Sequence, residues 1–318
     1  MSKLVLIDGN ALIHRAYHAI KPLTTRSGEV VNAVYGFTSI LMNILTEEQP
    51  KYIACTFDAA KKTFRHEKYK EYKATRVKAP DELYAQIPRI HEVVETMQIP
   101  KFIMEGFEAD DLIGTISRTA EKKKEISKVI IATGDMDALQ LISEKICVNN
   151  LHKGYKDSKC FTPQDVFDKC GVWPDQIVDY KGLTGDASDN IPGVKGIGEK
   201  TAARLLQQYQ NLEGIYEHMG DIPESQRIKL EANKENAFFS RELATIKCDV
   251  PIDFELEKCR ASEFDREAVF ELFESLQFYS LIRRLRQWQE ANNRLHNQVT
   301  AKKVARIKAT STDQLSLF

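Results

Sequence analysis

The sequence predicts an α/β fold, with a parallel sheet covered by helices on both faces, followed by an α-helical domain. Four short apolar runs bounded by Gly, Asp or Pro have the pattern of buried strands, at residues 4–7, 52–57, 101–104 and 128–132. Helical patterns lie between them, at residues 32–47, 81–97 and 110–122. Strands that alternate with helices are typical of a parallel sheet.

The second half of the chain is predicted to be helical throughout. The expected helices span residues 163–169, 174–182, 199–209, 225–232, 234–245, 266–276 and 279–293. We therefore predict an α/β domain over residues 1–165 and a helical domain over 166–290. Residues 291–318 are expected to be a flexible tail, since hydrophobic content falls and basic residues dominate.

Composition limits the class of protein but does not reveal its function. Of 318 residues, 42% are hydrophobic and 29% charged, as in a folded chain, and the net charge is −1, so charge placement must indicate any nucleic-acid binding. The apolar run at the N-terminus is too short for a signal peptide or membrane span, and we expect a soluble, cytoplasmic protein. The cysteines lack metal-binding spacing and are expected to be buried free thiols: Cys55, Cys147, Cys160, Cys170, Cys248 and Cys259.

Acidic residues follow each of the four predicted strands. A single Asp after a strand most often caps the next helix. However, the carboxyl ends of parallel strands share one edge, so these acids should converge, and a group of carboxylates repels itself unless cations are present. Oxygen ligands suit Mg²⁺ or Mn²⁺, and two such ions are typical of phosphodiester cleavage. The candidate acids after the strands are Asp8, Asp58, Glu108, Asp110, Asp111, Asp135 and Asp137, and Asp186 and Asp189 follow at the start of the helical half.

A basic segment follows Asp58. Residues 61–78 contain eight Lys or Arg residues with Phe64, Tyr69 and Tyr72 among them. Arg65, Tyr69, Tyr72 and Arg76 would form one stripe of a helix. The alternatives are a solvated surface helix and a surface that contacts the phosphates and bases of a nucleic-acid strand; the position next to Asp58 favours binding.

Three glycines lie close together in residues 191–206, just before a predicted helix. Such a turn lets backbone N–H groups approach an anion, and the helix N-terminus favours negative charge. We interpret it as a helix–hairpin–helix that grips a DNA phosphate, because a simple tight turn explains only one glycine. The candidate DNA-binding residues here are Gly193, Lys195, Gly196, Gly198, Lys200, Thr201 and Arg204.

Several ordered strings together resemble a known family. They are Leu-Ile-Asp-Gly-Asn (6–10), Ala-Val-Tyr-Gly-Phe (33–37), Phe-Arg-His-Glu (64–67), Tyr-Lys-Ala-Thr-Arg (72–76), Gly-Phe-Glu-Ala-Asp-Asp (106–111) and the run from Leu183 to Gly198. From Leu4 to about Leu285 the chain resembles the 5′ nuclease domain of the bacterial DNA polymerase I family and its flap-endonuclease relatives. One departure is Met136 and Ala138, where relatives often carry Lys and Leu; this puts one basic contact in doubt.

The resemblance implies a resolvase-like (PIN-like) nuclease domain and a helical DNA-binding domain. It implies one metal site formed by Asp8, Asp58, Glu108 and Asp110, and a second surrounded by Asp111, Asp135, Asp137, Asp186 and Asp189. By position, Tyr72, Lys73 and Arg76 match a helical arch near residues 60–80 that holds a 5′ single strand. The hairpin is similar to a duplex-binding element associated with potassium.

These features predict a structure-specific 5′→3′ exonuclease and 5′-flap endonuclease. It would cut DNA with 5′ flaps, nicks or 5′ ends during primer removal and repair, as a monomer with two metal ions, and Lys73 and Arg76 would polarise the scissile phosphate. The alternatives are a DNA-structure-binding protein without activity and an RNA-cutting PIN-like nuclease. With 318 residues we expect a stand-alone nuclease without a polymerase domain.

The C-terminus ends in large apolar residues after a polar, basic stretch. The residues Gln314, Leu315, Ser316, Leu317 and Phe318 resemble the peptide by which bacterial replication and repair proteins bind the sliding clamp. The alternatives are that these residues pack on the helical domain or have no role. If the peptide binds the clamp, tethering would raise the local concentration of the nuclease at DNA junctions.

Overall fold

The computed structural model describes residues 2–151, 159–261 and 265–288. The chain forms two compact units, one ending at Asp265 and one beginning at Arg266. In the second unit, α13 (Arg266–Ser275) confirms a predicted helix, and residues 279–288 are also helical. None of the helices in the described ranges is both long and apolar enough to cross a bilayer. The predicted tail and its C-terminal peptide lie outside the described residues.

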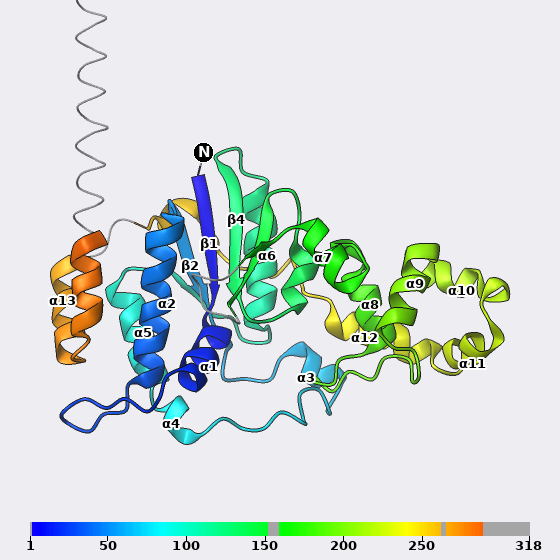
Figure 1. Ribbon diagram of the computed structural model, residues 1–318, viewed down its shortest axis with the longest axis horizontal. Helices are drawn as coiled ribbons and strands as arrows, with labels where there is room; N and C mark the ends of the chain where they lie inside the picture. The colour runs from blue at the N-terminus through cyan, green and yellow to red at the C-terminus, as the bar shows by residue number, and fades with distance from the viewer. Residues whose placement is uncertain (1, 152–158, 262–264, 289–318) are drawn as a thin grey trace, which may run out of the picture. The chain divides into compact units, whose positions relative to one another are not determined.

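A six-stranded sheet forms the centre of the first unit (Figure 1). The strand order is β3-β2-β1-β4-β5-β6, and only the pairing of β5 with β6 is antiparallel. All four predicted strands are present, whereas β5 and β6 were not predicted because their apolar runs are very short. The strands are β1 (Ser2–Asp8), β2 (Tyr52–Thr56), β3 (Lys101–Phe102), β4 (Ile126–Thr133), β5 (Ile146–Asn150) and β6 (Cys160–Phe161).

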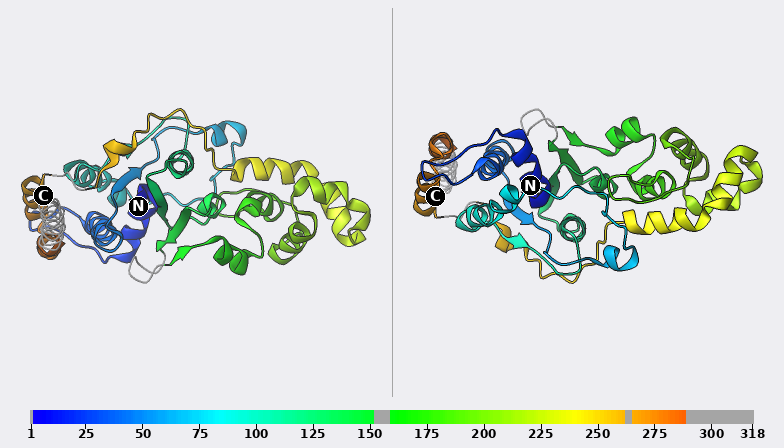
Figure 2. Two further views of the ribbon diagram at one scale, coloured as in Figure 1. Left: turned by 90° about the horizontal axis from the view of Figure 1, so that it is seen from above. Right: turned by 90° about the horizontal axis from the view of Figure 1, so that it is seen from below.

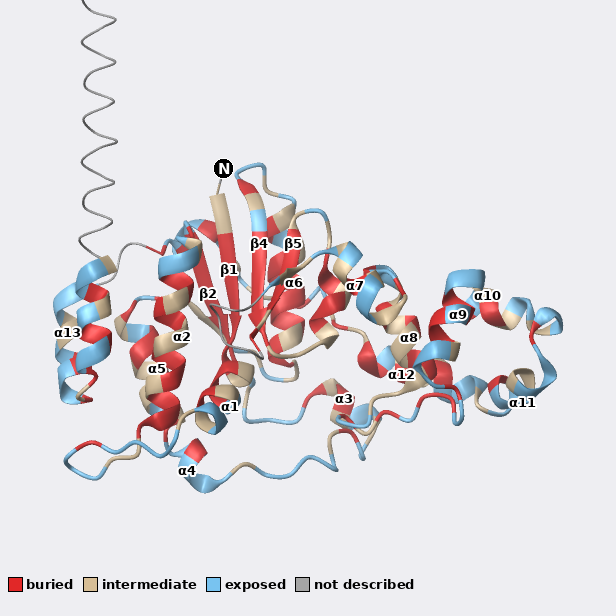
Figure 3. Cartoon of the chain, in the orientation of Figure 1, coloured by how far each residue is buried: buried red, intermediate tan, exposed pale blue. Residues whose placement is uncertain are grey.

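Helices cover both faces of this sheet. Figure 2 shows α2 (Asn32–Glu48) and α6 (Ala109–Glu121) on opposite faces. Leu4 and Leu6 of β1 join the core cluster that contains Ile113 of α6. Residues 4–7 are fully buried (Figure 3), and a continuous apolar run is expected for a strand covered on both sides. The other helices here are α1 (Gly9–Ala19), α3 (Phe64–Lys68), α4 (Asp81–Tyr84), α5 (Ile87–Thr96) and η1 (Asp137–Leu141).

The part that follows is helical, as predicted. It contains α7 (Pro163–Cys170), η3 (Pro174–Gln176), α8 (Ile177–Thr184), α9 (Glu199–Tyr209), α10 (Leu212–Glu217), η4 (Met219–Asp221), α11 (Glu224–Ala232), α12 (Lys234–Ala244) and η5 (Leu256–Cys259). Helix α8 packs against both α9 and α12. After α12 the chain returns to the sheet, where Arg260 forms an isolated bridge with Tyr52.

The helix predicted over residues 81–97 is wrong in one respect, because it is divided into α4 and α5. Pro88 lies in the first turn of α5 and has no backbone N–H for a helical hydrogen bond to the preceding turn. The side chain of Gln86, between the two helices, accepts a hydrogen bond from the backbone N of Ala33 at 2.8 Å. It thereby satisfies a donor at the start of α2.

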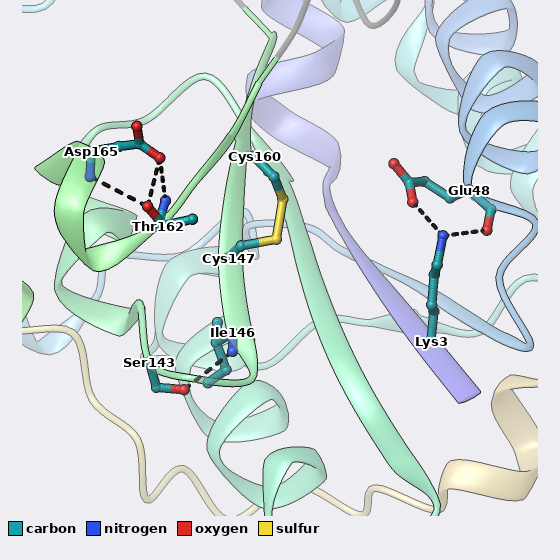
Figure 4. The surroundings of a disulfide bond; sticks show 8 residues. All are labelled: Lys3, Glu48, Ser143, Ile146, Cys147, Cys160, Thr162 and Asp165. Carbon is teal, nitrogen blue, oxygen red and sulfur yellow. Dashed lines mark hydrogen bonds and ion pairs between the residues drawn. A yellow bond between two sulfur atoms is a disulfide. The ribbon is translucent and has the colours of Figure 1, made fainter. Parts of the chain in front are cut away.

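The prediction that all cysteines are buried free thiols is also wrong. Cys147 on β5 and Cys160 on β6 form a disulfide (Figure 4). The antiparallel register pairs Cys160 with Asn149 and leaves the Cα atoms of the two cysteines 5.6 Å apart, within bonding range. The other four cysteines are free, and of these Cys248 is exposed.

Candidate functional site

The carboxyl edge of the parallel sheet opens into a cleft of about 610 Å³. Asp8 ends β1, and the other acids lie just after β2, at the start of α6 and after β4. Parallel strands direct these chain ends to one edge, which explains why residues far apart in sequence meet. Five of the nine predicted acids line this cleft, and they are Asp8, Asp58, Glu108, Asp110 and Asp135.

Internal donors hold two of these carboxylates in place. Asp8 accepts hydrogen bonds from the backbone N of Ala11 at 3.0 Å and from Oγ1 of Thr133 at 2.6 Å. Asp58 accepts one from the backbone N of Ala109 at 2.7 Å. Both acids therefore satisfy a backbone donor at a helix start and also line the cleft, so the capping interpretation and the site interpretation are compatible.

Burial and mutual repulsion disfavour the charged forms of these acids. Burial raises the pKa of Asp8 to about 6, against the opposing hydrogen bonds from Ala11 and Thr133. The pKa of Asp110 is raised well above its usual value, first by burial and then by the charges of Asp135 and Asp8. No described residue donates a hydrogen bond to the Asp110 side chain. A hard divalent cation fits this set of oxygen donors, because it would offset the repulsion.

The carboxylates of the predicted acids do not surround one point. Across the described ranges, no three Asp, Glu, His or Cys side chains stand close enough together to hold a metal ion. Internal cations instead partner several of them: Lys73 Nζ donates to Glu108 at 2.8 Å, and Lys181 bridges Asp137 and Asp186. Cation binding would therefore require these side chains to exchange partners.

Lys181 pairs with two predicted site acids and was not singled out from the sequence. Its ammonium group lies between Asp137 and Asp186, and its own pKa is raised because these carboxylates outweigh its burial. Burial alone would raise the pKa of Asp186, but hydrogen bonds from Lys181 and Ser188 lower it to about 2. The pKa of Asp137 stays high, at about 6, because of burial and the charge of Asp135. The sequence feature that could have indicated this role is the position of Lys181 on the predicted helix just before Asp186.

The single helical stripe predicted from Arg65 to Arg76 is wrong. Helix α3 ends at Lys68, turns follow, and Lys73 has a left-handed φ of 56°. Tyr72 is drawn into the interior, where only 4% of it is exposed, and its hydroxyl donates to Asp189 at 3.0 Å. A continuous helix would not allow this turn, because a left-handed residue interrupts the hydrogen-bond ladder.

The two predicted catalytic cations do line the cleft. Lys73 donates to Glu108, and the guanidinium of Arg76 pairs with Asp189. The backbone N of Lys73 also donates to the carbonyl of Asp189 at 2.9 Å, so this segment is attached to the loop that carries the second group of acids. Both cations therefore lie beside the predicted site carboxylates.

Asp137, Asp186 and Asp189 do not line the cleft, and Asp111 and Arg65 also lie outside it. Asp111 is fully buried and Arg65 is 2% exposed; the two form an ion pair with a distance of 2.8 Å. Their geometry does not bring Asp111 to a metal site or Arg65 to a DNA surface.

The glycine-rich turn adopts a compact hairpin before α9. Gly193 is buried with a φ of 63°, and its backbone N donates to Oγ of Ser240 at 2.9 Å. In contrast, Lys195, Gly196, Gly198, Lys200 and Arg204 are exposed, and Thr201 is partly exposed. The turn therefore combines a packed interior with a basic outer surface at the start of a helix.

Two family models match adjacent parts of the chain. Residues 3–171 match the 5′-3′ exonuclease, N-terminal resolvase-like domain, and residues 172–267 match the 5′-3′ exonuclease, C-terminal SAM fold. The chain belongs to the 5′-3′ exonuclease family. This membership confirms the predicted fold class and the prediction that the protein is a nuclease, and hence a hydrolase.

Relatives of this exonuclease-family chain include bacterial DNA polymerases I. It is 43% identical over 285 residues to that of Caldicellulosiruptor bescii, covering 89% of the chain and 33% of the relative. It is 44% identical over 284 residues to that of Bacillus subtilis, covering 89% and 32%. The chain thus spans about a third of the length of the curated relatives it matches.

Solved structures show the same fold at low identity. T5 5′-exonuclease with divalent metal ions (zinc) bound has a TM-score of 0.64 at 20% identity, covering 86% of this chain and 98% of that one. The catalytic core of Rad2 in complex with DNA substrate has a TM-score of 0.59 at 14% identity, covering 87% and 88%. Human GEN1 in complex with Holliday junction DNA reaches 0.54 at 14% identity, covering 88% and 68%.

One side of the cleft is lined by residues that were not predicted from the sequence. Helix α1 contributes His14, Arg15 and His18 to the lining. The signal for this helix was present, since Leu12, Ile13 and Ala16 have helical spacing after the N-cap Asp8.

Proposed function

We propose that this chain is a structure-specific 5′→3′ exonuclease and 5′-flap endonuclease that hydrolyses DNA phosphodiesters in primer removal and repair. The observation that carries the proposal is the meeting of five carboxylates with Lys73 and Arg76 in one cleft. Carboxylates repel DNA phosphates, so a protein that only bound DNA would lose affinity by gathering them. The related structures of T5 5′-exonuclease with divalent metal ions bound, and of Rad2 and GEN1 in complex with DNA, support the same chemistry.

The acids would hold two Mg²⁺ or Mn²⁺ ions. One ion would bind Asp8, Asp58, Glu108 and Asp110, and the other would lie among Asp135, Asp137, Asp186 and Asp189. When bound, such a metal pair activates water as the nucleophile and stabilises the leaving oxygen. Asp111 was also predicted in the second group, but both of its carboxylate oxygens are already bonded to Arg65 and to backbone N–H groups, which does not support that role.

The cations of the chain have their own part in this function. Lys73 and Arg76 would exchange their carboxylate partners for the scissile phosphate, polarise it and stabilise the charge that develops on it. Lys181 would keep Asp137 and Asp186 in position before metal binds. The product strand would carry a 5′-phosphate.

The hairpin would bind the duplex part of the substrate without reading its sequence. Lys195, Lys200 and Arg204 are exposed cations beside a helix start, which suits contact with phosphates. The predicted potassium ion would bind carbonyl oxygens of this turn. The Gly196 carbonyl, which now accepts from Nζ of Lys229 at 3.1 Å, is one such oxygen.

A cleavage assay tests the proposal. The chain is incubated with a labelled 5′-flap duplex, a nicked duplex and a single-stranded RNA, each with and without Mg²⁺. We expect metal-dependent cleavage of the DNA substrates. Asp135→Ala should reduce the rate at least about 100-fold, since loss of a ligand should cost no less than loss of an outer-shell partner, while DNA affinity stays similar or rises. Cleavage of RNA alone, or metal-independent rates, would overturn the proposal.

We also propose that Gln314 to Phe318, which lie outside the described residues, bind the bacterial sliding clamp, and that the protein is a monomer. Leu315, Leu317 and Phe318 would act as apolar anchors in a pocket of the clamp. Titration of purified clamp with the full chain and with a chain ending at Asp313 tests this. Equal binding by both would refute it, and light scattering of the free protein would check the monomer.

A further inference from the structure

We propose that Arg65 and Asp111 are a positioning pair: buried together, they fix Glu108 in the cleft and tie it to residues 243–250, called here the return segment. The inference rests on the proposed function, since it assigns a role in cleavage to residues that touch neither cleft nor solvent. It replaces the predicted roles of Arg65 in DNA binding and Asp111 in metal binding.

Arg65 has no donor left for DNA. Its Nε donates to the carbonyl of Leu243, one terminal nitrogen donates to Glu108 and Asp111, and the other donates to Asp111 and the carbonyl of Thr245. A guanidinium has five N–H groups, and these five bonds use all of them. A phosphate could be bound only by breaking this set.

Asp111 has no acceptor position left for a metal ion. Each carboxylate oxygen accepts one bond from Arg65 at 2.8 Å. Oδ1 also accepts from the backbone N of Lys247 at 2.8 Å, and Oδ2 from the backbone N of Glu108 at 3.1 Å. A carboxylate offers about four lone-pair sites, so all of them are occupied.

The pair holds Glu108 at two points. Asp111 fixes its backbone N, and Arg65 contacts its Oε2 at 3.3 Å. The other oxygen, Oε1, faces Lys73 at 2.8 Å, and Glu108 lines the cleft. The pair thus sets both the backbone and the side-chain position of a predicted metal ligand, as outer-shell partners of metal ligands commonly do.

The return segment is attached to the same pair. In addition to the contacts of Leu243, Thr245 and Lys247, the backbone N of Val250 donates to Oγ1 of Thr115 on α6 at 3.1 Å. The segment also lies very close to α6, since a Cβ built on Gly114 would be 2.9 Å from the carbonyl of Lys247. Only glycine permits this approach, and it lets the backbone N of Lys247 stay within hydrogen-bonding distance of Asp111.

These contacts link the hairpin to the cleft. Gly193 in the hairpin donates to buried Ser240 on α12, and α12 ends at the return segment, whose Leu243 carbonyl accepts from Arg65. Arg65 in turn contacts Glu108. Hydrogen bonds at either end of the last turn of α12 therefore connect the predicted duplex-binding turn to a predicted metal ligand, and the Arg65–Asp111 pair is the last step of this connection.

Two conservative variants test the proposal. Arg65→Lys keeps the positive charge but cannot form the bidentate ion pair with Asp111. Asp111→Asn keeps the shape of the side chain but removes its negative charge. For each, calorimetry measures Mn²⁺ affinity without DNA, and single-turnover cleavage of a 5′-flap duplex measures rate against Mg²⁺ concentration. We expect metal affinity and maximal rate to fall about 10- to 100-fold, the range seen for outer-shell partners. Affinity for the flap duplex in EDTA should stay within about twofold, because neither side chain contacts phosphate.

The matched control is Arg89→Lys. Arg89 lies on α5 and pairs with two carboxylates, Glu29 and Glu92, each at 2.7 Å, and none of these contacts involves Glu108 or the return segment. This variant should retain wild-type metal affinity and rate. If the wild type itself does not cleave the flap, the proposed function fails, whereas the Mn²⁺ titration still tests the pair.

Three outcomes would overturn the inference. Weaker metal-free DNA binding by Arg65→Lys, with a smaller salt dependence, would make Arg65 a phosphate contact. Complete loss of one bound Mn²⁺ in Asp111→Asn would make Asp111 a ligand. Lower thermal stability with unchanged metal affinity would make the pair merely structural. If single variants fold poorly, Arg65→Met with Asp111→Leu replaces the buried pair by apolar groups, which proteins often tolerate; it should still show the lower metal affinity.

Discussion

The surroundings of individual carboxylates in this chain shift their pKa values in opposite directions. Asp8 accepts bonds from Ala11 and Thr133 yet lines the cleft with a pKa raised to about 6, chiefly by burial. Asp165 is a contrasting case, because it belongs to the capping box at the start of α7. Hydrogen bonds from Lys159 and Thr162 lower its pKa to about 2. The first acid costs the fold stability when charged, and the second contributes stability when charged.

Asp165 therefore gives a prediction with a definite sign. Its pKa is lower in the folded state, so its contribution is present above pH 4 and is lost as pH falls through about 2. Asp165→Asn should lower the free energy of unfolding by about 1 kcal/mol at pH 7, as for loss of a helix cap. The difference from wild type should shrink as pH decreases. Urea unfolding of both proteins at pH 7, 5 and 3 measures this, and a difference independent of pH would contradict it.

At the scale of elements, prediction succeeded where local pattern and packing agree. Strands β1 and β4 have short, continuous apolar runs, as expected for strands covered on both faces, and the acids after them converge because the sheet is parallel. The single helix from Arg65 to Arg76 failed because Tyr72 is drawn into the interior. Helical spacing among polar and aromatic residues does not reveal such tertiary contacts.

The partners of the site residues could not be predicted from the sequence. Arg65 and Asp111 are separated by 46 positions, and Lys181 reaches Asp137 from a different element. Only the tertiary fold brings these charges together: Arg65 of α3 pairs with Asp111 of α6, and α8 packs against η1, which begins at Asp137. A carboxylate followed by a helix looks the same in sequence whether it faces a cleft or a buried arginine.

The hairpin provides a prediction about a whole element. A Cβ on Gly193 would lie 2.3 Å from the backbone N of Gly185, and the φ of 63° disfavours other residues. Gly193→Ala should therefore lower the free energy of unfolding by about 1–3 kcal/mol and weaken duplex binding. Gly198→Ala is the control, because its Cβ would meet nothing within 4 Å. Thermal unfolding compares the two, and equal losses of stability would show that the hairpin tolerates a shift at Gly193.

At the scale of the whole molecule, charge is separated although the net charge is only −1. The cleft gathers acids, whereas Lys200 and Arg204 lie one turn apart on the exposed side of α9 and line, with Lys169, a pocket of about 390 Å³. DNA would therefore be attracted at the hairpin, and its phosphates would meet acids at the cleft. The hairpin should contribute affinity, and the cleft should contribute chemistry once cations are bound.

This separation predicts how binding depends on salt. Lys200→Ala with Arg204→Ala should weaken binding to a nicked duplex in EDTA for every sequence tested. If each side chain contacts one phosphate, the slope of log K against log salt should fall by about 2, since each contact contributes about 1. The control removes two exposed lysines, Lys122 and Lys124, from the loop that leads into the amino end of β4. Both variants lose the same net charge, so only a local contact distinguishes them. An equal change of slope in both would mean that DNA senses the overall charge of the molecule, and the assignment of the hairpin as the duplex-binding surface would then fail.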